Sequence, residues 1–188
     1  MTNPKRGCEP PSHSRPIKRQ YSPTSWLDPR VEVRSSPIEG QGLFAREQIH
    51  RGEVVLVLGG RVIGDEELRR LSPHSSLAIG EGLNLVQEQD DVAQFGNHSC
   101  DPNLWMEDEV TLSARREISA GKEITVDYAL LTVGPTWEMT CACGSPLCRR
   151  RVTGADWQLS QLQERYAGHF SPFINDRIDR LKGSAPDT

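Results

Sequence analysis

The side chains with the most chemistry lie in one nine-residue run, Phe95-Gly96-Asn97-His98-Ser99-Cys100-Asp101-Pro102-Asn103. The run is too polar for a core strand and too poor in apolar residues for a helix. The side chains of Asn97, Asp101 and Asn103 can bond nearby backbone, and Pro102 fixes its own φ angle. We therefore expect a compact loop anchored to the backbone. For such a run taken alone, an ordinary surface turn is the simpler interpretation.

Three cysteines follow within eight residues, Cys141, Cys143 and Cys148. With Cys8 and Cys100 the chain has five cysteines, and this odd number argues against a secreted disulfide framework. Three thiolates leave a tetrahedral Zn²⁺ ion one ligand short, and Cys100 is the obvious fourth. A disulfide is the alternative, although the two cysteines of a Cys-x-Cys pair are poorly placed to bridge each other. The spacing favours a zinc site, with Cys8 left over.

Two further segments combine glycines with a reactive or packing side chain. Gly40-Gln41-Gly42-Leu43-Phe44-Ala45 has glycines that permit close backbone approach to a ligand. Gly121-Lys122-Glu123-Ile124-Thr125-Val126-Asp127-Tyr128 is a turn that runs into a short strand ending on a tyrosine. Taken alone, the first is a hairpin turn and the second ends on a packed tyrosine with a wet hydroxyl. Their functional interpretation depends on the polar run and the cysteines that accompany them.

Composition limits the class of protein that can hold these residues. The chain has 188 residues, enough for one domain with a core, and contains neither an apolar run of membrane-helix length nor the apolar centre of a signal peptide. We therefore expect an intracellular protein, cytoplasmic or nuclear, that does not bind membranes. The net charge is −4, but residues 1–25 carry about +4, so the remainder carries about −8. An acidic body disfavours direct nucleic-acid binding and favours a basic peptide as partner.

The pattern of apolar residues predicts a mainly β domain with irregular loops and helices only near its end. A proline-rich, polar segment opens the chain, and one or two helical turns are expected over 65–71. Near the end we expect a short amphipathic helix over 157–166 and a second helix over 172–183, capped by Ser171, with Ile174, Ile178 and Leu181 on one face. Strands are expected at 31–34, 54–58, 77–79, 83–86, 104–106, 110–112 and 124–126.

In this order, the Gly-x-Gly segment, the Asn-His-Ser-Cys-x-Pro-Asn block, the Asp-Tyr strand and the Cys-x-Cys-x4-Cys triplet resemble the SET-domain protein-lysine methyltransferases with a post-SET zinc segment. The resemblance covers roughly residues 30–152. It implies a β-clip type fold of several small sheets, in which the last strand threads beneath the loop with the polar block as a pseudoknot. The expected divisions are a flexible basic arm (1–28), the SET domain (29–132), the post-SET segment (133–152) and a helical tail (153–188).

The resemblance also implies the roles of individual residues. S-adenosylmethionine would be held by backbone near Gly40, Gly42 and Leu43 and by Asn97 and His98. Tyr128 would be the catalytic residue, because its hydroxyl would orient the lysine amine beside the transferring methyl group. The zinc ligands would be Cys100, Cys141, Cys143 and Cys148.

The expected function is S-adenosylmethionine-dependent, in-line methyl transfer to a lysine in a basic protein segment, with self-methylation at Lys18 as one candidate. The sequence departs from the family in lacking any aromatic residue between Phe44 and Phe95, and in having Val126 and Gly96 where larger residues are common. Arg149-Arg150-Arg151 also follows Cys148 where Arg-Gly is frequent. The alternative is therefore a catalytically silent SET-fold protein that binds a cofactor or partner. Neither the substrate protein nor the number of methyl groups added is encoded in these patterns.

Overall fold

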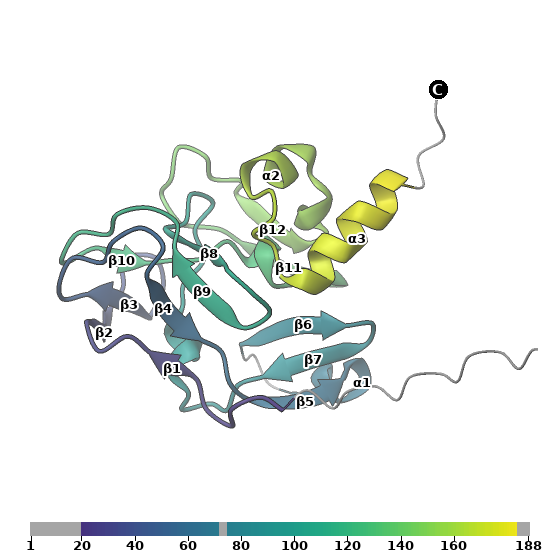
Figure 1. Cartoon of the computed structure of the whole chain (residues 1–188), viewed down its shortest axis with the longest axis horizontal. Helices are drawn as coiled ribbons and strands as arrows, with labels where there is room; N and C mark the ends of the chain where they lie inside the picture. The colour runs from purple at the N-terminus through teal and green to yellow at the C-terminus, as the bar shows by residue number, and fades with distance from the viewer. Residues whose placement is uncertain (1–19, 72–74, 184–188) are drawn as a thin grey trace, which may run out of the picture.

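Short apolar runs separated by glycine and acidic turns form four small antiparallel sheets in the computed structural model, which describes residues 20–71 and 75–183 (Figure 1). Lys18, the proposed self-methylation residue, lies outside the described residues. One sheet has the strand order β1 (Trp26–Leu27), β4 (Val54–Val57), β9 (Thr111–Ala114) and β8 (Leu104–Met106). Two three-stranded sheets have the orders β10 (Glu123–Ile124), β3 (Gln41–Ala45), β2 (Val31–Ser35) and β5 (Arg61–Gly64), β7 (Leu83–Val86), β6 (Ser76–Gly80). The fourth sheet is a ribbon of β11 (Gly134–Thr140) and β12 (Arg151–Gly154).

The helices are few and short, and the longest lies at the end of the described chain. Figure 1 shows α2 and α3 on the same side of the molecule as the β11–β12 ribbon. Among the described residues, none of the helices has the length and apolar character needed to cross a lipid bilayer. The helical elements are α1 (Asp65–Leu68), η1 (Val92–Phe95), η2 (Tyr128–Leu130), η3 (Asp156–Gln158), α2 (Ser160–Arg165) and α3 (Pro172–Gly183).

The mainly β fold class predicted from the sequence is confirmed, and β2, β4, β6, β7, β8 and β9 correspond to predicted strands. The turn expected over Gly40-Gln41-Gly42 is correct only at Gly40, whose φ is +49°. Gly42 lies within β3, because that strand pairs with β2 on one side and β10 on the other. β1, β5, β11 and β12 were not predicted from the sequence, although residues 136–140 and 151–154 alternate between more and less exposed side chains.

The carboxyl-terminal helices differ from prediction in three details. The stretch 157–166 divides into η3 and α2, with Leu159 extended between them. α3 begins at Pro172 as predicted, but Leu181 is 55% exposed because the last turn of α3 extends beyond the core. The hydroxyl of Ser171 is buried and has no hydrogen-bond partner among the described residues, so the predicted side-chain cap is wrong.

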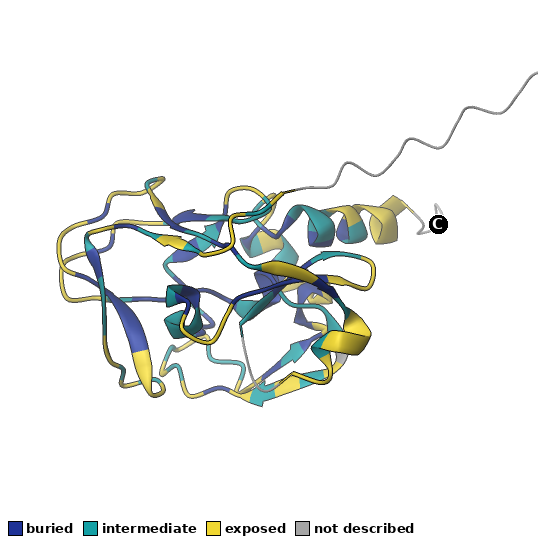
Figure 2. Ribbon diagram, turned by 90° about the horizontal axis from the view of Figure 1, so that it is seen from below, coloured by how far each residue is buried: buried dark blue, intermediate teal, exposed yellow. Residues whose placement is uncertain are grey.

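The tail is nevertheless part of the main core. Tyr166 and Phe170 are among the largest fully buried side chains and meet edge to face, with ring centroids 5.9 Å apart. The Ser171 N–H donates to the Leu130 carbonyl at 2.9 Å, which ties the tail directly to η2. Figure 2 shows the buried residues along the interior of the sheets and on the inner side of α3. The tail therefore supports the segment that carries Tyr128.

Candidate functional site

The polar run Phe95–Asn103, called here the polar loop, lies alongside the extended segment 123–126 that leads from β10 to Tyr128. The Val126 N–H donates to the Asn97 carbonyl at 3.1 Å, and His98 and Val126 form a parallel bridge. Asn103 binds the same segment through its side chain, which accepts from the Thr125 N–H at 2.8 Å and donates to the Glu123 carbonyl at 2.7 Å. The prediction of a backbone-anchored loop is therefore correct.

The structure brings four cysteines into one cluster, called here the cysteine cluster: Cys100, Cys141, Cys143 and Cys148. Their sulfur atoms all lie within 4.8 Å of one another, with the Cys100 and Cys141 sulfurs 3.9 Å apart. A tetrahedral zinc site with Zn–S bonds of about 2.3 Å has sulfur–sulfur edges of about 3.8 Å. None of the four forms a disulfide within the described chain. The donor set and its dimensions therefore fit zinc.

Burial affects the chemistry of these thiols. Cys100 and Cys141 are buried, and Val152 packs against them. Burial raises the pKa of the Cys100 thiol to about 11, and it also raises the pKa of Cys141. A coordinated cation reverses this preference, because a thiol that binds a metal loses its proton. Metal binding at the cysteine cluster would therefore release protons.

A second corner of the site is formed by β3 and Asn97. The Asn97 amide donates to the Glu123 carboxylate at 2.8 Å and approaches the Gln41 carbonyl at 3.0 Å. A side chain at Gly42 would place its Cβ 2.3 Å from the Glu123 carboxylate, so it would displace the carboxylate that holds Asn97. No described residue donates a hydrogen bond to the Asn97 side-chain oxygen. That oxygen is therefore available to accept from a ligand.

Of the residues predicted to bind the cofactor, Gly40, Gly42, Leu43 and Asn97 come together at this corner. Leu43 contributes only its backbone, because its side chain is 1% exposed and belongs to the core. His98, the fifth, is placed differently: its ring is buried behind the polar loop.

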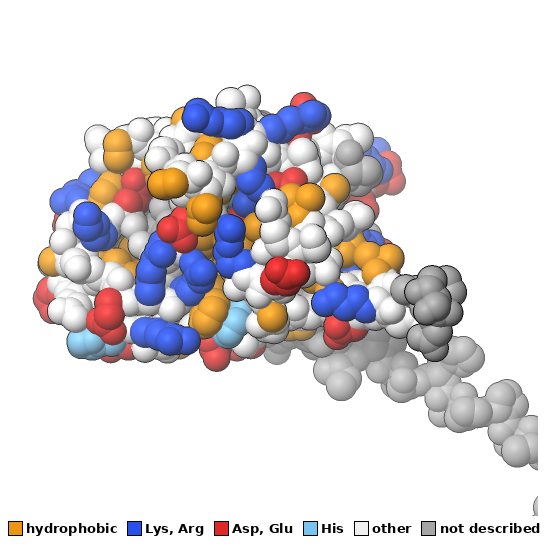
Figure 3. All heavy atoms as spheres, turned by 90° about the horizontal axis from the view of Figure 1, so that it is seen from above, with side chains coloured by type: hydrophobic (Ala, Val, Ile, Leu, Met, Phe, Trp, Pro, Cys, Tyr) orange, Lys and Arg blue, Asp and Glu red, His pale blue; other side chains and the backbone are white. Residues whose placement is uncertain are grey.

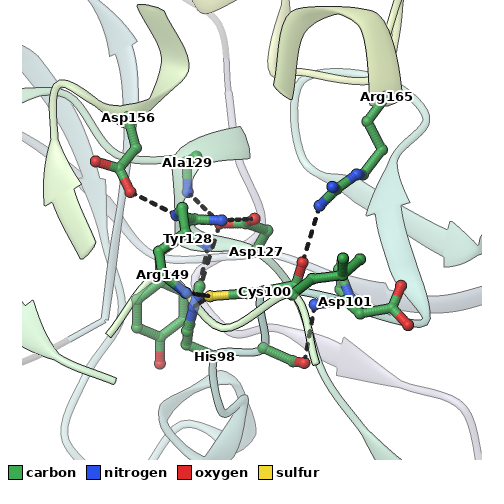
Figure 4. Close-up of polar contacts among 12 residues, drawn as sticks. His98, Cys100, Asp101, Asp127, Tyr128, Ala129, Arg149, Asp156 and Arg165 are labelled. Atoms are coloured by element: carbon green, nitrogen blue, oxygen red, sulfur yellow. Dashed lines mark hydrogen bonds and ion pairs between the residues drawn. The ribbon is translucent and has the colours of Figure 1, made fainter. Parts of the chain in front are cut away.

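The imidazole of His98 has both nitrogens engaged within the protein. Nδ1 accepts from the Tyr128 N–H at 3.2 Å, so the proton of the neutral ring lies on Nε2, 3.3 Å from the Cys100 sulfur (Figure 4). Burial lowers the pKa of His98 to about 4, although Asp127 lies 3.7 Å from Nδ1. The ring is therefore neutral and unavailable to a cofactor, and only the His98 backbone could contribute to a cofactor site.

Tyr128, the predicted catalytic residue, begins η2. Its hydroxyl donates to the Gly96 carbonyl at 2.9 Å, and burial raises its pKa to about 12. The ring of Trp137, from β11, lies 6.0 Å from the Tyr128 ring. Trp137 did not emerge from the sequence analysis, although it is the only aromatic residue between Tyr128 and Trp157. It provides an aromatic neighbour of the kind that the sequence lacks before the polar loop.

Behind Tyr128 lies an interior network centred on the fully buried Asp127. Two Arg149 nitrogens donate to its carboxylate at 2.7 Å each, and the Tyr166 hydroxyl donates at 3.2 Å. The Arg149 Nε donates to Asp156 at 2.8 Å. In the sequence, Asp127 and Arg149 are visible only as parts of motifs. The sequence signal that could have identified them is a charged residue next to a motif residue that the fold must bury.

The outer side of the polar loop carries basic side chains. Arg115 and Arg116 bond the Asp101 carboxylate, and Arg165 donates to the Cys100 carbonyl at 3.1 Å. Figure 3 shows a mixture of basic and acidic side chains on the face seen from above, with several arginine or lysine side chains near its centre. The acidic character inferred from net charge is therefore not uniform over the surface.

Comparison with known proteins supports the resemblance to SET domains. Residues 40–129 match the family model of the SET domain. The chain is 27% identical over 150 residues to the histone-lysine N-methyltransferase ash1 of Drosophila melanogaster, covering 71% of this chain and 7% of that protein. It is 31% identical over 136 residues to human histone-lysine N-methyltransferase 2B, covering 64% of this chain and 5% of that protein. The chain thus spans less than a tenth of either relative.

The fold comparison agrees. The structure of Arabidopsis thaliana SUVH6 in complex with S-adenosylmethionine superposes with a TM-score of 0.57 at 22% identity, covering 66% of this chain and 33% of that one. Residues 40–129 thus match a SET domain, as the sequence motifs predicted.

Proposed function

We propose that this protein is an S-adenosylmethionine-dependent protein-lysine N-methyltransferase. One observation carries the proposal: the Tyr128 hydroxyl is held by the Gly96 carbonyl, directly beside the Asn97 and Gly42 corner. The hydroxyl that would orient the lysine acceptor is therefore held by Gly96, the residue next to Asn97 of the corner that would hold the methyl donor. The SET-domain match and the names of the relatives support the same activity.

The residues that would hold the methyl donor are Asn97 and the backbone of Gly40, Gly42 and Leu43, with the backbone of His98 beside them. When bound, S-adenosylmethionine supplies an electrophilic methyl group on a sulfonium. The Asn97 side-chain oxygen is suited to accept from an ammonium group, and its NH₂ group is fixed by Glu123 and the Gln41 carbonyl. The ligand would therefore meet an acceptor that is already oriented.

The chain's own residues must also prepare the lysine. Its ammonium has a pKa of about 10.4, so forming the free amine at pH 7 costs roughly 4.6 kcal/mol at about 1.36 kcal/mol per unit. An apolar surrounding lowers this cost, because desolvation disfavours the charged form. The rings of Tyr128 and Trp137 offer such walls. The proton leaves to solvent before transfer, and the neutral Tyr128 hydroxyl then orients the amine for in-line attack.

We further propose that the cysteine cluster holds a structural zinc ion and that the post-SET segment (133–152) closes over the polar loop. The acceptor class we propose is a lysine side chain in a basic protein segment, with the protein located inside the cell. The printed names of the relatives refer to histone lysines, but the chain's own substrate requires direct identification.

The test begins with methyl-labelled S-adenosylmethionine incubated with the protein and a cell extract, followed by mapping of the labelled residue. Tyr128→Phe is expected to lower turnover by roughly 10² to 10³ with cofactor affinity nearly unchanged. Asn97→Ala is expected to weaken cofactor binding first, measured by calorimetry. Tyr21→Phe removes a hydroxyl that bonds Glu109 instead and serves as the matched control.

A second candidate function is a catalytically silent SET-fold protein that binds the cofactor or a partner. The observation that favours it is the absence of any aromatic residue between Phe44 and Phe95. Cofactor binding without labelled product would favour this second candidate. Full turnover in Tyr128→Phe would instead contradict our assignment of Tyr128 as the catalytic residue.

A further inference from the structure

Two separate routes join the cysteine cluster to Tyr128 through the interior. In the first, His98 lies between the Cys100 sulfur, 3.3 Å from Nε2, and the Tyr128 N–H, 3.2 Å from Nδ1. In the second, the Arg149 N–H donates to the same sulfur at 3.3 Å, and the Arg149 guanidinium donates twice to Asp127. Asp127 precedes Tyr128 and caps η2 by accepting from the Ala129 N–H at 3.1 Å. Figure 4 shows both routes converging on one sulfur.

Both routes are shielded from solvent. The side chains of His98 and Asp127 are 1% and 0% exposed, and that of Arg149 is 10% exposed. Buried polar groups of this kind have few alternative partners, so displacement of one group is transmitted to the next. The bidentate pairing of Arg149 with Asp127 also fixes orientation as well as distance.

The common point of the two routes is Cys100. A metal-bound thiolate has a fixed position and carries negative charge, so it accepts the Arg149 N–H and the His98 Nε2–H more strongly than a thiol does. Groups that bond to metal ligands in this manner orient the ligands and adjust metal affinity. The contacts at Cys100 therefore change with occupancy of the cysteine cluster.

We propose that Arg149 and His98 are positioning residues that couple metal occupancy of the cysteine cluster to the placement of Tyr128. This inference rests on the proposed function only in treating Tyr128 as the group whose placement matters for transfer. The coupling is reciprocal, because two linked binding or ordering events must affect each other equally. Whatever holds Tyr128 in place strengthens zinc binding, and zinc binding holds Tyr128 in place.

The first test measures zinc affinity of the full chain by competition with a chromophoric chelator. Arg149→Lys keeps the charge and the backbone N–H but loses the bidentate pairing, and it is expected to weaken zinc binding by about 10-fold to 100-fold. Arg151→Lys, two residues along on the exposed surface, is the matched control and is expected to leave zinc affinity unchanged. Tyr166→Phe removes a hydrogen bond to Asp127 without breaking either route and should stay within about twofold of wild type.

The second test follows Tyr128 directly. The chain has three tyrosines, so 3-fluorotyrosine labelling should give three fluorine resonances, and Tyr128→Phe assigns one of them. Removing zinc from the wild-type protein is expected to shift or broaden the Tyr128 resonance. In Arg149→Lys at saturating zinc, that resonance should lie between its zinc-free and zinc-loaded wild-type positions, because the His98 route remains.

Unchanged zinc affinity in Arg149→Lys, or a Tyr128 resonance equal to that of zinc-loaded wild type, would overturn the coupling. If Arg149→Lys does not fold, the wild-type comparison with and without zinc still decides, because an unmoved Tyr128 resonance would contradict the proposal. Neither measurement uses methyl transfer. A protein without activity can therefore still show the coupling, and an active protein can fail to show it.

Discussion

Two ion pairs from neighbouring residues show how differently the same chemistry can act in this protein. Arg149 pairs with Asp127 in the interior, where the two side chains are 10% and 0% exposed. Arg151 pairs with Glu138 on the β11–β12 ribbon, where the two side chains are 69% and 55% exposed. Both pairs join an arginine of the 149–151 run to a carboxylate. Only the first lies behind Tyr128.

The difference follows from solvation. Water screens an exposed pair and solvates either partner when the other is lost, so such pairs contribute little. A buried pair must offset the full desolvation cost of both charges. Arg149 offsets this cost by donating hydrogen bonds to both Asp127 and Asp156. We infer that the interior network fixes geometry, whereas the surface pair mainly keeps the ribbon soluble.

The largest expected effect is that of breaking the interior pair. Asp127→Asn leaves the Arg149 charge buried without its main partner, and we expect the free energy of unfolding to fall by about 3–5 kcal/mol. Glu138→Gln, the matched change in the surface pair, should leave the unfolding midpoint unchanged. Urea unfolding at saturating zinc would measure both. Equal losses in the two variants would show that burial does not distinguish the pairs.

A smaller, local effect is expected from the cysteine cluster. Cys143→Ser removes one half-buried thiol ligand and should loosen the segment after Tyr128 while leaving the small sheets folded. Amide hydrogen exchange in β12 should then accelerate by about tenfold or more, with exchange in the β5–β7–β6 sheet unchanged. Metal analysis should find about one zinc ion per wild-type chain. A metal-free sample with wild-type exchange in β12 would contradict this prediction.

The smallest expected effect is that of changing Arg150, which lies between Arg149 and Arg151 in the sequence. Arg150 has a φ of +65°, in the left-handed region that favours glycine, at the position where Arg-Gly is frequent in the resembled family. Arg150→Gly should relieve this strain and stabilise the fold by about 0–1 kcal/mol after the added freedom of the unfolded chain is counted. Arg151→Gly, in the extended β12 strand, should instead lower the thermal midpoint. A lower midpoint in both variants would show that the φ of Arg150 carries no strain.

Sequence patterns were most informative where function demands particular residue types close together. The polar loop, the Asp-Tyr strand and the cysteine triplet predicted a SET domain, and the family model and fold comparison confirm it. Predictions that depended on a single feature were weaker. Gly42 was placed in a turn but lies in a strand, Ser171 makes no cap, and Leu181 is exposed.

The sequence alone determined the mainly β class and the residues that could bind a metal, because these depend on local spacing and residue type. The tyrosine predicted at the end of a strand instead begins η2, and β10 ends at Ile124. Tertiary structure alone decided that the His98 ring turns away from the predicted cofactor corner and toward Cys100. It also brought Trp137 to Tyr128 and buried Arg149 against Asp127. These contacts join residues far apart in the chain, and whether such a charge is solvated or buried depends on the packing of the whole domain.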